Sequence, residues 1–300
     1  MNIFKKDKRK EIKNESPLEI KRSNISTSSS NKSSVKLRVF RINAVQNPKD
    51  VPHFDEFHVP VKRWTTVLDA LLDAKNYQDS SIGIRYSFRM ASCGSWGMKI
   101  NGIPRLACYT KISDLDTNTI TCEPLPNFPY IRDLVTDFSQ FFNHHRSVMP
   151  FIQNKKADIP NVNELSEYEQ SPQDLDKFLQ FSYCIKCGLC YSACPTVATD
   201  LKFPGPQALS QAYRYFADSR DSDKSNRLKV IDTSHGIWRC HFAGSCSNVC
   251  PKGVDPALGI QLLRSHLLGI SNSEKKIAKL QDRSPNSYRE EEEEKESEKE

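Results

Sequence analysis

The chain has 300 residues, of which 37% are hydrophobic and 27% are charged, so it is long and apolar enough to bury one or two ordinary cores. No run of 18 apolar residues occurs, and the sequence therefore predicts no transmembrane helix. The net charge of +6 comes largely from residues 1–40, which carry eleven Lys or Arg and four Asp or Glu. No basic stripe with interleaved aromatic residues follows, which excludes a nucleic-acid partner.

The two ends of the chain have compositions that cannot build a core. Residues 1–34 are rich in Lys, Ser and Asn and predict a disordered basic tail. Their acidic residues argue against a transit peptide, and they lack the apolar segment of a secretory signal. Residues 271–300 end in REEEEEKESEKE and predict a solvated, charged tail.

Residues 35–140 have the pattern of a small α+β domain. Strands are predicted where apolar and polar residues alternate, and a helix where apolar residues recur every three or four positions. A segment with four Gly predicts a turn-rich loop. The predicted elements are a strand over 35–42, its hairpin partner over 54–61, a helix over 65–76, a loop over 81–108 and a strand over 119–125.

Residues 141–270 are predicted to form a second, α-helical domain. A helix over 133–153 would join the two domains, and the polar residues 154–172 would form a linker or a surface excursion. Further helices are predicted over 206–220 and 256–269, each beginning at a Pro that suits a first helical turn.

Several polar residues in this half invite a functional interpretation that the pattern does not support. His144 and His145 have no acidic or Cys neighbour in sequence, and we expect both on the surface. Asp218, Arg220 and Asp221 are expected to form ion pairs at a helix end. No catalytic Ser/His/Asp arrangement, phosphate-binding loop or dinucleotide fingerprint appears, so no substrate chemistry is expected on this chain itself.

The cysteines carry the main functional signal, because seven of the ten lie in two tight groups. The first group has the spacing C-x2-C-x2-C-x3-C-P and consists of Cys184, Cys187, Cys190, Cys194 and Pro195. This is the ferredoxin spacing for a [4Fe–4S] cluster, in which three thiolates bind one cluster and the fourth binds a second cluster. Zinc sites more commonly use two separated pairs of ligands.

The second group repeats this spacing with one thiolate missing. It contains Cys240, Cys246 and Cys250, and Ala243 stands where the remaining Cys would be. A missing corner ligand favours a three-iron [3Fe–4S] cluster. Reciprocal ligation then predicts two ligand sets. They are Cys184, Cys187, Cys190 and Cys250 for the [4Fe–4S] cluster, and Cys194, Cys240 and Cys246 for the [3Fe–4S] cluster.

These motifs give the chain a family resemblance. The segments CIKCGLCYSACP, GPQALSQAYRYFADSRD and GIWRCHFAGSCSNVCPKGVDPALGIQ resemble the iron–sulfur subunit of succinate dehydrogenase and fumarate reductase, as do SFRMASCGSWGMKINGIPRLACYT and PLPNFPYIRDLVTDFSQFF. The resemblance spans residues 36–270 and is stronger to fumarate-reductase-type, archaeal and bacterial members. It implies a β-grasp, plant-type ferredoxin domain followed by a helical two-cluster domain.

The N-terminal cluster motif departs from the family pattern. Members bind a [2Fe–2S] cluster with C-x4-C-x2-C and a fourth Cys further on. Here only Cys93 and Cys108 match, whereas Phe88 and Trp96 replace the other two ligands. Phe and Trp cannot bind iron, and their bulk would fill the volume of a lost cluster. We therefore expect this cluster to be absent or strongly altered.

The departure leaves alternatives open. Recruitment of Cys122 as a ligand is disfavoured because it lies on a predicted strand. In the family this cluster is the first acceptor from the flavin. Either a partner chain supplies the cluster, or this chain is an impaired copy, or it differs here for a reason that the sequence does not reveal.

The resemblance also implies a quinone near the three-iron cluster. His241 and Arg264 match family positions at that pocket, and Gln261 lies one turn before Arg264. A cation there would stabilise negative charge on a reduced quinone. The alternatives are a packed His241 and an ordinary helix-end Arg264. The segment Val197–Ala198–Thr199 replaces a family Trp pair, which weakens this assignment.

The implied function is electron transfer in the respiratory chain and the tricarboxylic acid cycle. The implied partners are an FAD-containing catalytic subunit, membrane anchor subunits and quinone. The implied location is the cytoplasmic face of the cell membrane, with the matrix side of the mitochondrial inner membrane as the alternative. Rival hypotheses are a cluster-deficient adaptor, a subunit of a heterodisulfide-reductase or glycolate-oxidase type flavoenzyme, and a zinc module.

Overall fold

The computed structural model describes residues 34–43, 49–153 and 170–270. Residues 1–33 of the predicted basic tail and the whole predicted tail over 271–300 lie outside the described residues, as does most of the predicted linker over 154–172. Among the helices that the described ranges contain, none is long and apolar enough to cross a bilayer.

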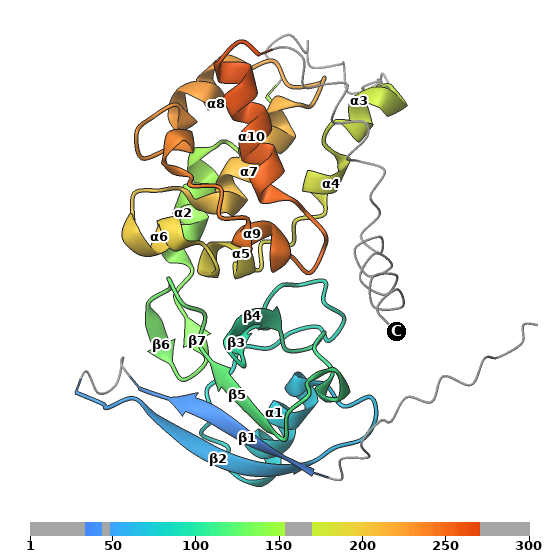
Figure 1. Cartoon of the computed structure of the whole chain (residues 1–300), viewed down its shortest axis with the longest axis vertical. Coiled ribbons are helices and arrows are strands. Elements are labelled where there is room, and N and C mark those ends of the chain that lie inside the picture. Colours follow the sequence, from blue (N-terminus) through green and yellow to red (C-terminus); the bar gives the residue numbers. More distant parts are fainter. Residues whose placement is uncertain (1–33, 44–48, 154–169, 271–300) are drawn as a thin grey trace, which may run out of the picture. The chain divides into compact units, whose positions relative to one another are not determined.

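The N-terminal half is built on a five-stranded mixed sheet with the strand order β2-β1-β5-β3-β4 (Figure 1). β1 pairs antiparallel with β2 and parallel with β5, which brings residues 36–39 beside residues 119–122. Its alternating sequence buries Val35, Leu37 and Val39 on one face. The strands are β1 (Ser34–Arg41), β2 (His53–Pro60), β3 (Gly97–Ile100), β4 (Ile103–Leu106) and β5 (Thr119–Glu123).

Helix α1 (Val67–Tyr77) packs its apolar stripe into the core that this sheet forms. Its first turn is closed by a capping box, in which Thr66 and Asp69 exchange side-chain and backbone hydrogen bonds. Val67, Leu68 and Leu71 are buried, as the helical periodicity predicts. The N-terminal half is a mixed sheet packed against one helix, and the C-terminal half is helical. This confirms the predicted α+β fold class.

Two predicted elements of the N-terminal half were wrong in part. The predicted loop over 81–108 contains the β3–β4 hairpin, whose turn is Asn101–Gly102 with both φ angles positive. An Asn-Gly turn between apolar runs is a strong hairpin signal, and it was present in the sequence. The predicted helix over 133–153 is shorter, because its first residues form the turn and second strand of a hairpin between β6 (Tyr130–Arg132) and β7 (Val135–Thr136).

The C-terminal half is helical, as predicted, and α7 and α10 lie side by side in it (Figure 1). Gly259 of α10 lies against both α7 and the ring of Phe181, and a Cβ there would lie only 3.0 Å from the Phe181 ring. The helices are α2 (Ser139–Ser147), α3 (Pro172–Asp176), α4 (Leu179–Ser182), α5 (Leu189–Ser192), α6 (Pro195–Thr199), α7 (Gly205–Phe216), α8 (Lys224–Ile231), α9 (Ser245–Asn248) and α10 (Pro256–Leu267).

The two halves are joined by direct contacts. The side-chain amide of Asn127 donates to three backbone carbonyl oxygens, those of Tyr191, Ser192 and Cys194, at 3.0–3.1 Å. Gly94 packs so tightly against the second half that an added Cβ would lie 2.9 Å from the Cα of Cys187. A division of the chain at residue 140 stays a prediction.

Ion pairs explain the ADSRD segment. Asp218 is fully buried and accepts hydrogen bonds from Arg214 and Arg220 at 2.8–2.9 Å. Asp221 pairs with Arg227 at 2.9 Å, and both side chains are fully buried. The predicted helix-end ion pairs are confirmed, and they are more deeply buried than the sequence indicated.

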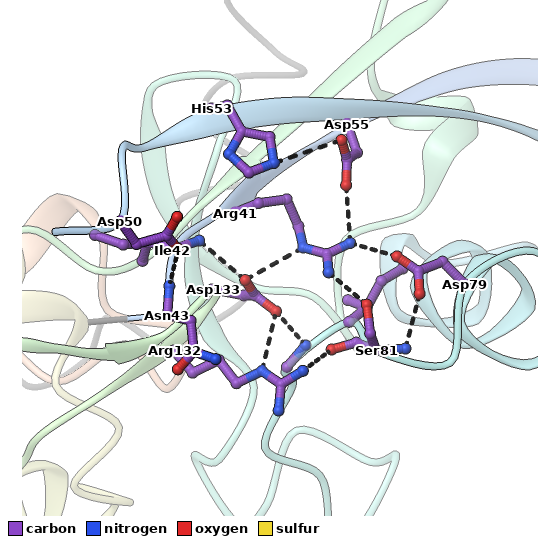
Figure 2. Close-up of polar contacts among 12 residues, drawn as sticks. Arg41, Ile42, Asn43, Asp50, His53, Asp55, Asp79, Ser81, Arg132 and Asp133 are labelled. Carbon is purple, nitrogen blue, oxygen red and sulfur yellow. Dashed lines mark hydrogen bonds and ion pairs between the residues drawn. The ribbon is translucent and has the colours of Figure 1, made fainter. Parts of the chain in front are cut away.

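A buried carboxylate organises the end of β1 (Figure 2). Asp133 accepts hydrogen bonds from the guanidinium of Arg41 at 3.2 Å and from the backbone N–H groups of Ile42 at 3.0 Å and Gly83 at 2.6 Å. Arg41 also pairs with Asp55 and Asp79. This network ties β1, the β6–β7 hairpin and the segment that follows α1 to one another.

We expect Asp133→Asn to lower the free energy of unfolding by about 2 kcal/mol, because one acceptor oxygen and the charge that Arg41 needs are lost inside the protein. The matched control is Asp55→Asn at the solvated side of the same network, for which we expect less than about 1 kcal/mol. Thermal and denaturant unfolding of both variants measure this difference. Equal losses would contradict the central position of Asp133.

Candidate iron–sulfur centres

The two cysteine groups fold as copies of one backbone motif. Lys186 and Phe242 both have a φ of 55°, and two residues later Gly188 and Gly244 have φ angles of 78° and 74°. Each left-handed Gly begins a short helix, α5 or α9, and each group ends in Cys-Pro. When the two loops are compared, Ala243 takes the place of Cys187. The second loop therefore keeps the backbone shape of the first and lacks only the thiolate side chain.

Four thiols lie close together: those of Cys184, Cys187 and Cys190 from the first group and that of Cys250 from the second. Cys190 is half-buried, and desolvation first, then the nearby thiols of Cys187, Cys184 and Cys250, raise its pKa well above the usual value. Burial likewise raises the pKa of Cys187 to about 12, although the backbone N–H of Leu189 donates to its sulfur. Several thiolates cannot be buried together in the absence of positive charge, and iron ions supply that charge.

Three thiols line a cavity in the second group. The lining includes Cys194, Cys240 and Cys246, together with Ala243 and Gly244. Desolvation first, and then the nearby thiols of Cys194 and Cys240, raise the pKa of Cys246 to about 11 against a hydrogen bond with Ser247. A cavity with three sulfur donors and a methyl group at the fourth position suits a cluster with one corner absent.

The tertiary structure brings the last cysteine of each group to the opposite group. Cys250 belongs to the second run in sequence, but it lies near Cys184 and Cys187. Cys194 belongs to the first run, but it lies near Cys240 and Cys246. This is the crossed arrangement that reciprocal ligation requires.

No three His, Cys, Asp or Glu side chains within the described ranges converge tightly enough for a single metal ion. A cubane spreads its ligands over several iron atoms and needs a wider separation of the donor atoms.

The comparisons with known proteins agree with this geometry. Residues 36–143 match the family described as "2Fe-2S iron-sulfur cluster binding domain", and residues 180–254 match "4Fe-4S dicluster domain". The chain is 44% identical over 229 residues to the fumarate reductase iron-sulfur subunit of Mycobacterium tuberculosis, covering 76% of this chain and 91% of the relative. This chain belongs to the family of fumarate reductase and succinate dehydrogenase iron–sulfur subunits.

Other relatives support the same assignment. The mitochondrial succinate dehydrogenase iron-sulfur subunit of Candida glabrata is 33% identical over 252 residues, covering 83% of this chain and 98% of that protein. A chain of the Mycobacterium smegmatis Sdh1 complex in the apo form matches with a TM-score of 0.69 and 25% identity, covering 79% of this chain and 97% of that chain. As a member of this family, the chain is an iron–sulfur electron-transfer subunit of an oxidoreductase complex.

The N-terminal ligand positions of this family member do not offer four donors for a [2Fe–2S] cluster. Cys93 is half-buried and Cys108 is buried, and each thiol lies within electrostatic range of the other. The Trp96 side chain is 1% exposed, whereas Phe88 is 62% exposed. Cys122 lies fully buried on β5, opposite Val39 and Ile100 in the sheet. The residues present therefore do not fit the cluster that the matched family is described as binding.

The three residues predicted at the quinone end lie in different surroundings. His241 lines the cavity of the second cysteine group, and Gln261 is exposed on α10. The Arg264 guanidinium donates to the backbone carbonyl oxygens of Ile237 and Cys240 at 2.7–3.1 Å and lies over the Phe242 ring. Arg264 thus fixes the backbone that carries Cys240. This role differs from that of an ordinary Arg at a helix end, which was the alternative interpretation.

The expectation that both histidines of α2 lie on the surface was wrong. His145 is buried and shares a hydrogen bond with Gln207 of α7 at 3.2 Å, and burial lowers its pKa to about 4. The Gln207 amide also lies 3.9 Å from the sulfur of Cys184. Sequence reasoning missed Gln207, because nothing in its local pattern separates a residue beside a cluster from one in an ordinary buried helix.

We expect Cys190→Ala to abolish the EPR signal of the reduced [4Fe–4S] cluster, because one of its four proposed thiolate ligands is lost. Cys122→Ala is the matched control, since it removes a thiol outside the proposed ligand sets. It should keep the full iron content at a cost of about 1–2 kcal/mol in stability. An unchanged signal in Cys190→Ala would contradict the ligand set.

Proposed function

We propose that this subunit relays electrons between an FAD-containing subunit that interconverts succinate and fumarate and a quinone held by membrane anchor subunits. The observation that carries this proposal is the pair of crossed thiol sets, which lie against one another in a single helical half. The proposed ligands are Cys184, Cys187, Cys190 and Cys250 for the [4Fe–4S] cluster, and Cys194, Cys240 and Cys246 for the [3Fe–4S] cluster.

Iron–sulfur clusters, when bound, supply one-electron transfer at potentials that hydrogen bonds, charge and burial tune. The chain's own residues provide these conditions. Backbone N–H groups of Leu189 and Phe242 donate to the sulfurs of Cys187 and Cys240. The close approach of the two sets is supported by the electrostatic effect of Cys246, from the second set, on Cys190.

Exposed apolar side chains near the loop that carries Cys93 support the proposal that the flavin-containing subunit docks there. Tyr86, Phe88 and Met90 are 63%, 62% and 75% exposed, and they alternate along one short segment. Several large apolar side chains that are exposed together are a feature of protein interaction sites. Arg89 lies among them and pairs with Asp69 at 3.9 Å, so the segment is held by a charged contact to α1.

His241 supports a quinone beside the three-iron set, because it lines the same cavity as Cys240 and Cys246. Arg264 adds positive charge to this region and donates a hydrogen bond to the backbone carbonyl oxygen of Cys240. Gln261 completes the proposed quinone vicinity on the exposed side of α10. We place the subunit at the cytoplasmic face of the membrane, where thiols stay reduced during cluster assembly.

The test is purification of the complex under anaerobic conditions with its neighbouring subunits. We expect the chain to co-purify with an FAD-containing protein and the complex to catalyse electron transfer between succinate and a quinone. Capture without flavin or turnover would favour the rival hypothesis of a cluster-deficient adaptor. A colourless protein with stoichiometric zinc would favour the zinc module.

The assignment of Cys194, Cys240 and Cys246 to a three-iron cluster can be tested by converting that cluster into a four-iron cluster. We expect Ala243→Cys to add about one iron atom and to remove the EPR signal of the oxidised [3Fe–4S] cluster, because a fourth thiolate then faces the open corner. Ala243→Ser is the matched control of similar size and should keep that signal. Retention of the signal in Ala243→Cys would contradict the position of the open corner.

A further inference from the structure

The loop that should carry the [2Fe–2S] ligands is closed on itself by a hydrogen bond. The indole N–H of Trp96 donates to the backbone carbonyl oxygen of Phe88. These are the two positions where the family has a thiolate and this chain does not. A hydrogen bond between the two residues therefore stands where iron would otherwise join them. The Phe88 ring points outward, and its carbonyl group serves as the acceptor.

Trp96 also occupies space inside the loop. It is among the largest fully buried side chains of the described residues, and the ring of Tyr86 stacks on it with the centroids 5.9 Å apart and the planes at 23°. Buried aromatic rings pack to the density of the surrounding core and leave little room for another group.

Two thiols remain at the four family ligand positions, those of Cys93 and Cys108. The Ser95 hydroxyl and backbone N–H donate to the sulfur of Cys93. The far side of the loop has no room to open, because Gly94 packs on the backbone of Cys187. Cys93 and Cys108 are therefore the only thiols of the four family positions, with no third donor placed to complete a cluster.

We infer that the N-terminal half holds no [2Fe–2S] cluster and that Trp96 fills and closes its place. This inference rests on the proposed function for the other two clusters. The chain then carries about seven iron atoms, whereas the full family complement is about nine. The β-grasp half serves as a docking scaffold, held against the [4Fe–4S] loop by Gly94 and Asn127.

The decisive measurement is iron and acid-labile sulfide in the anaerobically purified full chain, with EPR spectra of the oxidised and dithionite-reduced protein. We expect about seven iron atoms, the signals of the [3Fe–4S] and [4Fe–4S] clusters, and no [2Fe–2S] signal. Cys93→Ala should leave the iron content unchanged. About nine iron atoms with a [2Fe–2S] signal that Cys93→Ala removes would overturn the inference.

Restoration of the ligands gives the complementary test. The double variant Phe88→Cys/Trp96→Cys should gain about two iron atoms and a [2Fe–2S] signal. The matched control Phe88→Ala/Trp96→Ala opens the same space without donors and should gain neither. Failure of a folded Phe88→Cys/Trp96→Cys variant to gain the signal would overturn the inference, because Phe88 and Trp96 would then not be what keeps the cluster out.

The outcomes separate this inference from the proposed function. If the native chain lacks the [3Fe–4S] and [4Fe–4S] signals, the proposed function fails. If it has both of these signals and a [2Fe–2S] signal as well, only the closure by Trp96 fails. Should the double variants not fold, the native iron content and Cys93→Ala decide the matter.

Discussion

The desolvation of clustered thiols is the constraint on which the rest of this structure depends. Cys187 and Cys246 are buried, Cys190 is half-buried, and each has further thiols beside it. Negative charges brought together away from water are costly unless positive charge is placed among them. Iron meets this need, and the fold presents the sulfurs from two matching loops, each of which leads through a left-handed Gly188 or Gly244 into a short helix that carries Cys190 or Cys246.

The contact between the two halves gives the N-terminal half a structural purpose that does not require a cluster. Asn127 binds three carbonyl oxygens on and beside α5, including that of Cys194. Gly94 packs directly on Cys187. Loss of two ligands did not remove this support, because Trp96 occupies the interior of the loop and its hydrogen bond to Phe88 keeps the loop closed.

Several features followed from local patterns, and several did not. The β1–β2 hairpin, α1, α7 and α10 were predictable because their apolar residues repeat with the period of a strand or a helix. The predicted helix over 133–153 begins only at Ser139, because Asp133 has a positive φ of 48° and a buried carboxylate that accepts from Arg41 of β1. The burial of His145 depends on Gln207, which is 62 residues away in sequence.

The sequence by itself determined the types of iron–sulfur centre, because ligand spacing within each cysteine run is local and Ala243, Phe88 and Trp96 are visible as substitutions. The spacing also predicted how the runs combine, and the tertiary structure brings Cys194 and Cys250 to the opposite group, where α5 and α9 contact one another. Only the tertiary structure decided that Arg264 holds the Cys240 backbone and that Trp96 turns inward while Phe88 turns out. The physical reason is that the burial of a side chain depends on contacts with residues that are distant in sequence. A short segment does not contain the residues that make those contacts.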